Sequence, residues 1–311
     1  MMATRSDIVI QEVSPRDGLQ IEPKWIETQD KIQLINAMSA IGFRRIEVSS
    51  FVSPRAVPSL RDAAEVFIGI ERRPDTIYTA LIPNHKGAEL ALAAGADELN
   101  FVMSASEMHN RANMNMTHER SLLSFAEIVK PARQRGVLVN GSIATAFGCP
   151  FEGLQPPEKV LNIVKRYLDL GVDGITLADT TGMANPRQVS QLVDETLNLL
   201  PSDKLTLHFH NTRGLGLVNI LAAYDAGARR FDAAIGGLGG CPFAPGATGN
   251  VCTEDLVNLC DEIGLTTGLD LKRLIHVSRR LVGLIGHDVS DQIVKAGRPK
   301  DLHPIPAHLR S

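Results

Sequence analysis

The chain has 311 residues, of which 44% are hydrophobic and 22% are charged, a composition typical of a globular protein with a large core. Its net charge is −3 and its pI is near 6.3, with Lys and Arg scattered along the chain, which excludes binding of nucleic acid through a basic surface. No apolar run approaches the roughly 20 residues that span a bilayer, so we also expect no membrane-bound function.

The start of the sequence shows neither the apolar segment of a secretory signal nor an Arg-rich leader. The cysteines include no C-x-x-C pair, and a chain of this length does not need disulfides to fold. We therefore expect a cytoplasmic protein with reduced cysteines.

A strand-helix unit recurs along the chain. Apolar runs rich in Ile, Val, Leu and Thr predict buried parallel strands, and in five units a glycine that fits the end of a helix precedes the strand. The eight segments that contain these strands are 7–14, 40–51, 75–83, 93–104, 134–144, 169–180, 204–211 and 225–236.

Helical patterns fill the intervals between these strands. In residues 185–200, Asn185 can cap the helix and Pro186 suits its first position. The last twenty or so residues are rich in Pro, His and Arg and are expected to be irregular. The other clear helical patterns are at 28–42, 253–264 and 270–286.

Eight successive strand-helix units predict a (β/α)8 TIM barrel. An open, doubly wound sheet is the alternative, but no G-x-G-x-x-G follows the first strand. No linker separates a second domain, so residues 1–311 are predicted to form one catalytic domain, with 264–311 as its helical and irregular extension.

Polar residues gather where the predicted strands end, which is where barrel enzymes carry their active sites. They are Glu12, Arg16 and Asp17 after the first strand, Glu47 and Ser49 in the second, Asn140 and Ser142 in the fifth, Asp179 and Thr180 after the sixth, and His208, His210 and Asn211 in the seventh.

The histidines of "LHFHN" predict a metal site. Because alternate residues of a strand share a face, His208 and His210 project together into the barrel mouth. Two imidazoles with a carboxylate bind a divalent ion, and Asp17 would reach them across the mouth, since the first strand does not neighbour the seventh. Two buried histidines bonded to the backbone are the alternative, but the acids at other strand ends favour a metal.

In "SPRDGLQ", Arg16 and Asp17 can form a surface ion pair, the usual outcome for such neighbours. Their position after an apolar strand, with Gly18 allowing a tight turn, favours a site instead. The Arg16 guanidinium would stabilise an enolate oxygen while the carboxylate binds metal. Glu47 is expected to hold Arg16 in place.

The glycine-rich loop "GGLGGCPFAPGATGN" follows the eighth strand and contains Cys241. Cys241 is either a small buried hydrophobe or a thiol that exchanges protons at the mouth. Asn250, at the end of this loop, can offer its amide oxygen to a metal. The cysteines expected to be buried hydrophobes are Cys149, Cys252 and Cys260.

The segments "EVSPRDGLQ", "EVSSFVSP", "GCPFEG", "LADTTG", "HFHNTRG" and this cysteine loop resemble the 3-hydroxy-3-methylglutaryl-CoA lyase family of TIM-barrel enzymes. The resemblance extends from about residue 8 to 268. It implies retro-Claisen cleavage of an acyl-CoA to acetyl-CoA and acetoacetate, with Mg²⁺ or Mn²⁺ as cofactor. Barrels of this kind often form homodimers, and we expect one here.

The resemblance also implies roles for single residues. Arg16 would polarise the thioester carbonyl, Cys241 on its loop would transfer a proton while the loop covers the substrate, and Glu47 and Asp179 would be acids that the reaction needs. The implied metal ligands are Asp17, His208 and His210, with Asn250 as a fourth. For coenzyme A, which needs a surface outside the mouth, the candidates are Asn84, Lys86, Lys24 and Arg55.

Two residues depart from the pattern of the lyase family. At position 211 the lyase family usually has aspartate, whereas this chain has asparagine, as the related synthases do. Arg213 adds a cation near the acyl end. The acyl group therefore stays open among 3-hydroxy-3-methylglutaryl-CoA, citramalyl-CoA, methylmalyl-CoA and a longer-chain 3-hydroxyglutaryl-CoA derivative. The alternatives to a lyase are a Claisen-type synthase, a branch without the cysteine loop, and a non-catalytic barrel that binds CoA.

Overall fold

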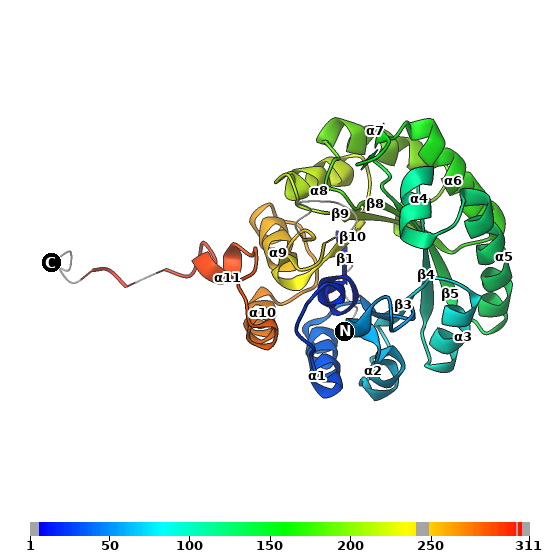
Figure 1. Ribbon diagram of the computed structural model, residues 1–311. Helices are drawn as coiled ribbons and strands as arrows, with labels where there is room; N and C mark the ends of the chain where they lie inside the picture. Colours follow the sequence, from blue (N-terminus) through cyan, green and yellow to red (C-terminus); the bar gives the residue numbers. More distant parts are fainter. Residues whose placement is uncertain (1–5, 241–248, 303, 307–311) are drawn as a thin grey trace.

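A computed structural model describes residues 6–240, 249–302 and 304–306. Parallel strands close into a barrel with the order β1-β10-β9-β8-β5-β4-β3-β2, and helices surround it (Figure 1). The TIM barrel predicted from the sequence is confirmed. The barrel strands are β1 (Val9–Glu12), β2 (Arg45–Ser50), β3 (Ile77–Ile82), β4 (Glu98–Ser104), β5 (Leu138–Ala144), β8 (Gly174–Asp179), β9 (Leu205–Phe209) and β10 (Arg230–Ala233).

The helices alternate with these strands along the chain, and β6 (Gly148–Cys149) pairs with β7 (Gly153–Leu154) in a small antiparallel ribbon. No helix in the described part of the chain is long and apolar enough to cross a membrane. The helices are α1 (Thr28–Ile41), α2 (Ala63–Gly69), α3 (His85–Ala93), α4 (Glu107–Met114), α5 (His118–Gln134), α6 (Pro157–Leu170), α7 (Pro186–Leu197), α8 (Gly216–Asp225), α9 (Thr253–Glu262), α10 (Leu271–Ile285) and α11 (Ile293–Ala296).

The local signals in the sequence hold in most places. Asn185 caps α7 in a capping box, with Pro186 at its first position. The short helix α11 interrupts a C-terminal segment that the sequence predicts to be irregular. The five glycines expected to end helices, Gly42, Gly95, Gly136, Gly171 and Gly227, all have positive φ.

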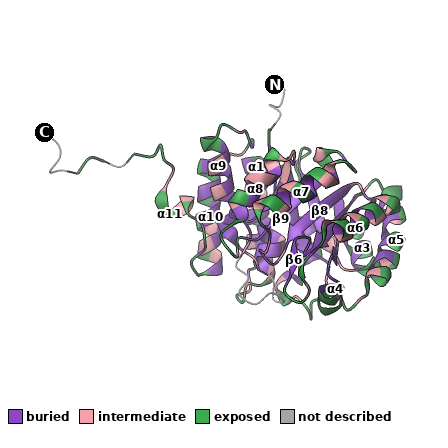
Figure 2. Ribbon diagram, turned by 90° about the horizontal axis from the view of Figure 1, so that it is seen from above, coloured by how far each residue is buried: buried purple, intermediate pink, exposed green. Residues whose placement is uncertain are grey.

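An apolar layer between the strands and the helices forms the core, so that the strands are buried while the helices expose one face (Figure 2). On one side of the barrel, the Phe101 ring stacks on Phe125 at 4.0 Å and meets Tyr167 edge-on at 5.2 Å. Gly141 lies under this cluster, where an added Cβ would come within 2.5 Å of the Tyr167 ring. This packing fixes α5 and α6 against β4 and β5.

The inside of the barrel is polar, unlike the layers of Val, Ile and Leu that usually fill such barrels. Near the N-terminal ends of the strands, the buried Arg45 pairs with Glu98 and donates to Gln11 at 2.9 Å. Buried polar groups are costly unless they are hydrogen-bonded, and these three side chains satisfy one another. Their contacts link β1, β2 and β4 across the lumen.

Glu12, at the end of β1, connects the barrel to the segment that follows β10. One oxygen accepts from the backbone amides of Ser14 (2.9 Å) and Ile235 (3.0 Å), and the other accepts from the Thr253 hydroxyl (2.7 Å). The side chain is fully buried. Burial raises the pKa of this carboxyl to about 7, although the three hydrogen bonds oppose the shift.

This raised pKa predicts a pH-dependent stability. A carboxyl with a folded pKa of about 7, above its ordinary value of 4.5, is protonated more readily in the folded chain. The free energy of unfolding should therefore fall as pH rises between these two values. Replacing Glu12 by Gln should remove up to about 3 kcal/mol of that fall, since one pKa unit corresponds to about 1.4 kcal/mol. Denaturant unfolding of both proteins from pH 5 to pH 8 measures this, and equal slopes would contradict it.

Candidate active site

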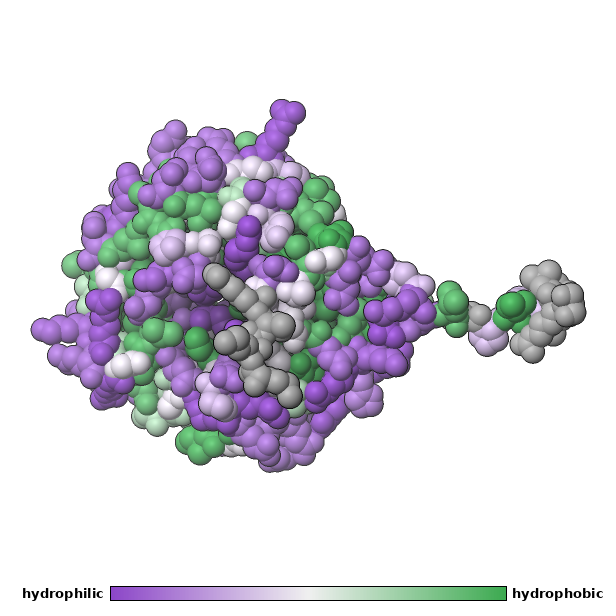
Figure 3. All heavy atoms as spheres, turned by 180° about the vertical axis from the view of Figure 1, so that it is seen from behind, coloured by the Kyte–Doolittle hydropathy of each residue, from purple (hydrophilic) through white to green (hydrophobic). Residues whose placement is uncertain are grey.

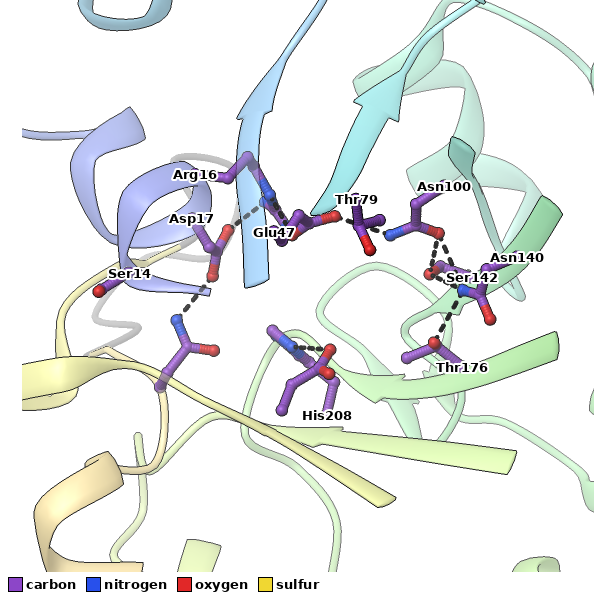
Figure 4. Close-up of polar contacts among 12 residues, drawn as sticks. Ser14, Arg16, Asp17, Glu47, Thr79, Asn100, Asn140, Ser142, Thr176 and His208 are labelled. Atoms are coloured by element: carbon purple, nitrogen blue, oxygen red, sulfur yellow. Dashed lines mark hydrogen bonds and ion pairs between the residues drawn. The ribbon is translucent and has the colours of Figure 1, made fainter. Parts of the chain in front are cut away.

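The candidate site lies at the C-terminal ends of the barrel strands, where the surface is hollowed and lined with hydrophilic residues (Figure 3). Arg16, Asp17 and Glu47 lie on one side of the opening, and Asn100, Asn140 and Thr176 lie on another, with His208 between them (Figure 4). Of the strand-end residues expected from the sequence, Arg16, Asp17, Glu47, Asn140 and His208 are thus brought to one mouth.

A single π-helical turn, η1 (Ser14–Gly18), directly follows β1 and presents Arg16 and Asp17. The amides of both residues donate to the Val13 carbonyl, at 3.1 and 2.7 Å. Gly18 has no positive φ, so it does not serve the tight turn expected from the sequence. A Cβ there would lie 3.0 Å from Cβ of Leu238, and glycine instead permits this close packing.

Arg16 is held between two carboxylates. Its Nη1 donates to Asp17 Oδ1 at 2.5 Å, and its Nε donates to Glu47 Oε2 at 2.6 Å. Burial lowers the pKa of the guanidinium, but the charges of Asp17 and Glu47 outweigh this and raise it above its ordinary value. Burial raises the pKa of Glu47, which accepts a further hydrogen bond from Asn100 at 2.9 Å.

The two histidines face each other across a short gap. His208 Nε2 and His210 Nε2 are 3.0 Å apart, and His210 Nε2 is 3.7 Å from Asp17 Oδ2. His208 lies in β9 and His210 directly follows this strand, whereas β10 separates β9 from β1. Asp17 therefore meets them across the mouth, as the barrel topology predicts.

A carboxylate that the sequence analysis missed, that of Asp232, lies behind His208. Asp232 pairs with His208 in the register of β9 and β10, and its Oδ2 lies 3.1 Å from His208 Nδ1. Burial lowers the pKa of His208, but Asp232 and Asp17 outweigh this and raise it. The only signal in the sequence was a lone aspartate in the eighth strand, whose partner depends on a register that the sequence does not show.

Asn250 closes the site from the end of the glycine-rich loop. Its Nδ2 donates to Asp17 Oδ2 at 2.7 Å and to the Leu238 carbonyl at 2.8 Å. Gly239, with φ +101°, lets the loop pass close by, because an added Cβ would come within 2.5 Å of that Nδ2. The amide oxygen of Asn250 is buried without a partner among the described residues.

This donor set fits a divalent ion. Asp17, His208 and His210 each offer a ligand atom within 4.8 Å of the others, and all three are buried. Three carboxyl groups, those of Asp17, Glu47 and Asp232, share this buried cluster with the guanidinium of Arg16. A divalent cation would offset the excess of carboxyl groups over guanidinium and would give the Asn250 oxygen a partner.

Asp17 is the carboxylate of this cluster whose pKa is lowered, so it is the one most readily ionised to bind such an ion. Burial raises its pKa, but Arg16, both histidines and the Asn250 hydrogen bond outweigh burial and hold the pKa at about 2. Asp17 is therefore ionised at any pH at which the protein would work.

The Asp179 carboxylate, at the end of β8, is bound to the backbone of the turn that follows this strand. The Asp179 carboxylate accepts from the backbone amides of Met183 (2.8 Å) and Ala184 (3.0 Å), and burial raises its pKa to about 6. Thr180 accepts weakly from the Thr145 amide at 3.4 Å. Asp179 thus holds the turn that follows β8.

Asn211 and Arg213, the two departures from the family pattern, both bind backbone groups of loops. Asn211 is exposed and accepts from the Gly216 amide at 3.0 Å, at the start of α8. Arg213 is exposed, and its Nη1 donates to the carbonyls of Thr181 (2.9 Å) and Gly182 (2.8 Å). Arg213 therefore joins the loop after β9 to the turn that Asp179 holds.

A chain of neutral side chains lines the far side of the lumen. Asn140 Nδ2 donates to Asn100 at 3.0 Å and to Thr176 at 2.9 Å, and the Ser142 hydroxyl donates to Asn100 at 2.7 Å. Ser49 is buried near the end of β2. The sequence analysis named Asn140 and Ser142 of this network but missed Asn100 and Thr176, whose partners lie on neighbouring strands.

The four residues proposed for coenzyme A are exposed and lie after β1, β2 and β3. Asn84 caps α3 by accepting from the Gly87 amide at 3.0 Å, and Lys24 donates to the Leu284 carbonyl at 2.6 Å. The other two candidates are Arg55 and Lys86. Within the described ranges, no hydrogen bond or ion pair joins any two of these four residues.

Cys241, the candidate thiol, lies outside the described residues. It follows Gly239 by two positions, and Gly239 lies beside Asp17. Cys149, Cys252 and Cys260 are free and buried, as expected from the sequence.

The family profile described as HMGL-like matches residues 7–281. The chain belongs to the HMGL-like family. A hydroxymethylglutaryl-CoA lyase of Bacillus subtilis is 42% identical over 272 residues, 88% of this chain and 91% of that protein. An (R)-citramalyl-CoA lyase of Chloroflexus aurantiacus is 42% identical over 300 residues, 93% of this chain and 95% of that protein.

A solved structure is also similar over nearly the whole chain. It is that of an HMG-CoA lyase from Acinetobacter baumannii in complex with coenzyme A and 3-methylmalate. It is 61% identical, has a TM-score of 0.95, and covers 98% of this chain and 100% of its own. The family and these relatives show that the chain is a lyase.

The donor set predicts that the metal-free protein binds one Mn²⁺ ion per chain. Replacing His210 by Ala removes one ligand atom and should weaken this binding by at least tenfold. Isothermal titration with Mn²⁺ measures the affinity, with His276→Ala as the control, because His276 is exposed on α10. Equal affinity in the wild type and the His210 variant would contradict the assignment.

Proposed function

We propose that the chain is a divalent-metal-dependent lyase that cleaves 3-hydroxy-3-methylglutaryl-CoA to acetyl-CoA and acetoacetate by a retro-Claisen reaction. The observation that carries this proposal is the buried group of Asp17, His208 and His210 beside the Arg16 guanidinium. The 42% identity to a hydroxymethylglutaryl-CoA lyase supports the choice of substrate.

The reaction breaks the bond between C2 and C3 of the acyl group after the 3-hydroxyl loses its proton. An ion held by Asp17, His208, His210 and Asn250, which we take to be Mg²⁺ or Mn²⁺, would lower the pKa of a hydroxyl bound to it. The protein itself holds the ligand atoms in position. Asp17 is fixed by Arg16 on one oxygen and by Asn250 on the other.

Arg16 is placed to stabilise the enolate that forms when this bond breaks. A guanidinium has five N–H donors, and contacts to Glu47 and Asp17 use three of them. Two N–H groups are left for a thioester oxygen, which gains negative charge in the transition state. Glu47 supports this role by fixing the plane of the guanidinium.

The enolate must then receive a proton, and we propose that Cys241 supplies it. Its place in the chain, two residues after Gly239, supports this role, since Gly239 lies beside Asp17. Asp179 would act indirectly, by holding the turn after β8 to which Arg213 is bonded.

For coenzyme A we propose the exposed side chains after β1, β2 and β3, which open on the same end of the barrel as the site. These are Lys24, Arg55, Asn84 and Lys86. The A. baumannii relative, solved with coenzyme A, supports a CoA thioester as the substrate.

We further propose one catalytic domain, with residues 264–311 as its extension, because one buried cluster extends from Ile8 to Val289. The protein is expected to form a homodimer, which analytical ultracentrifugation measures directly.

A second candidate substrate has its own support. The C. aurantiacus relative is a citramalyl-CoA lyase, and the A. baumannii structure contains 3-methylmalate. In both acyl groups the carboxylate is attached to the hydroxyl-bearing carbon, so cleavage would release a 2-oxo acid rather than acetoacetate. The same donor set and Arg16 serve either reaction.

A panel of thioesters distinguishes the two candidates. We expect the purified protein with Mg²⁺ to cleave 3-hydroxy-3-methylglutaryl-CoA with a higher kcat/KM than citramalyl-CoA or 3-methylmalyl-CoA, with acetoacetate as product. EDTA should abolish turnover, and added Mg²⁺ should restore it. A higher kcat/KM for citramalyl-CoA or 3-methylmalyl-CoA would show that this thioester is the substrate instead. Turnover that EDTA does not change would refute the metal-dependent reaction.

Replacing Cys241 by Ser tests the proton transfer. A serine hydroxyl is a far weaker acid than a thiol, so we expect kcat to fall by about 10²-fold or more with little change in KM. The control is Cys260→Ala, which removes a buried thiol on α9 and should keep the wild-type kcat. An unchanged kcat in the Cys241 variant would remove this residue from the reaction.

A further inference from the structure

We propose that Asp232 is a positioning residue for His208, because it holds the imidazole in the tautomer whose Nε2 faces the metal site. This inference rests on the metal-binding part of the proposed function. It assigns a role to a residue that neither the sequence analysis nor the family resemblance named.

The contact with Asp232 determines the tautomer of the neutral His208 ring. Asp232 and His208 are direct partners in the register of β10 and β9, and both side chains are more than nine-tenths buried. An ionised carboxylate only accepts hydrogen bonds, so at 3.1 Å from Asp232 Oδ2 the His208 Nδ1 must carry the proton. In a neutral imidazole, Nε2 then has the free lone pair.

That lone pair is aimed at the candidate metal centre. His208 Nε2 lies 3.0 Å from His210 Nε2, which in turn is 3.7 Å from Asp17 Oδ2. In the other tautomer, a hydrogen on His208 Nε2 would occupy the space that an ion needs. Asp232 thus decides whether His208 acts as a ligand or as a donor.

Asp232 is poorly explained as a purely structural residue. Its second oxygen, Oδ1, is buried and has no hydrogen-bond partner among the described residues. A half-satisfied buried carboxylate is costly, and an apolar side chain would be cheaper in a barrel interior. The contact with His208 gives this carboxylate a reason to be retained, since such outer partners orient metal-binding imidazoles.

The test is the Mn²⁺ affinity of the full-length Asp232→Asn variant. An amide at this position can donate to His208 Nδ1 and so place the ring hydrogen on Nε2. We expect the dissociation constant for Mn²⁺ to rise about 10- to 100-fold, with kcat recovering largely at saturating Mn²⁺. The matched control is Asp173→Asn, which changes a carboxylate that accepts from the Val139 amide at the opposite end of the barrel strands.

The outcomes separate this inference from the proposed function. If Asp232→Asn binds Mn²⁺ as tightly as the wild type, the positioning role is wrong and the metal site stands. If the wild type binds no Mn²⁺, both fall. A loss of affinity in Asp173→Asn equal to that in Asp232→Asn would show an unspecific effect and would overturn the inference.

A measurement on the wild-type protein needs no folded variant at position 232. In ¹⁵N-histidine-labelled, metal-free protein, long-range ¹H–¹⁵N spectra distinguish protonated from unprotonated ring nitrogens, and loss of one signal in His208→Gln assigns the ring. We expect His208 with Nδ1 protonated and Nε2 unprotonated at pH 8. The opposite tautomer would overturn the proposal.

Discussion

The rest of the site depends on the contacts of the Asp17 carboxylate. One oxygen is bound to Arg16, while the other accepts from Asn250 and faces His210. Because burial alone would raise the pKa of this carboxyl, its charge is maintained by these partners together with His208. The enolate-stabilising arginine and the candidate metal ligands are therefore fixed relative to one another through a single side chain.

The barrel supplies this arrangement through strand order. β10 lies between β1 and β9, so the turn after β1 and the histidines of β9 face each other, and Asp232 comes from the strand between them. The apolar packing lies outside the barrel, between strands and helices, which leaves the lumen to polar side chains. Hydrogen bonds among these side chains offset the cost of burying them.

The sequence predicted the strands, the barrel and the pairing of His208 with His210, because apolar runs and a two-residue period are local patterns. It did not predict the contact of Asp232 with His208 or the hydrogen bonds of Glu12 to residues after β10, since both depend on register between distant segments. The sequence analysis named Asp179 as an acid that the reaction needs and Asn84 as a candidate for coenzyme A. Their hydrogen bonds in a turn and in a helix cap follow only from backbone geometry.

The central claim is that Asp17, His208 and His210 hold one divalent ion beside Arg16. Crystals grown with Mn²⁺ and measured at a wavelength where manganese scatters anomalously test it directly. We expect one strong peak per chain within about 2.3 Å of Asp17 Oδ2, both histidine Nε2 atoms and Asn250 Oδ1. A peak elsewhere at saturating Mn²⁺, or one that touches the histidines without Asp17, would contradict it.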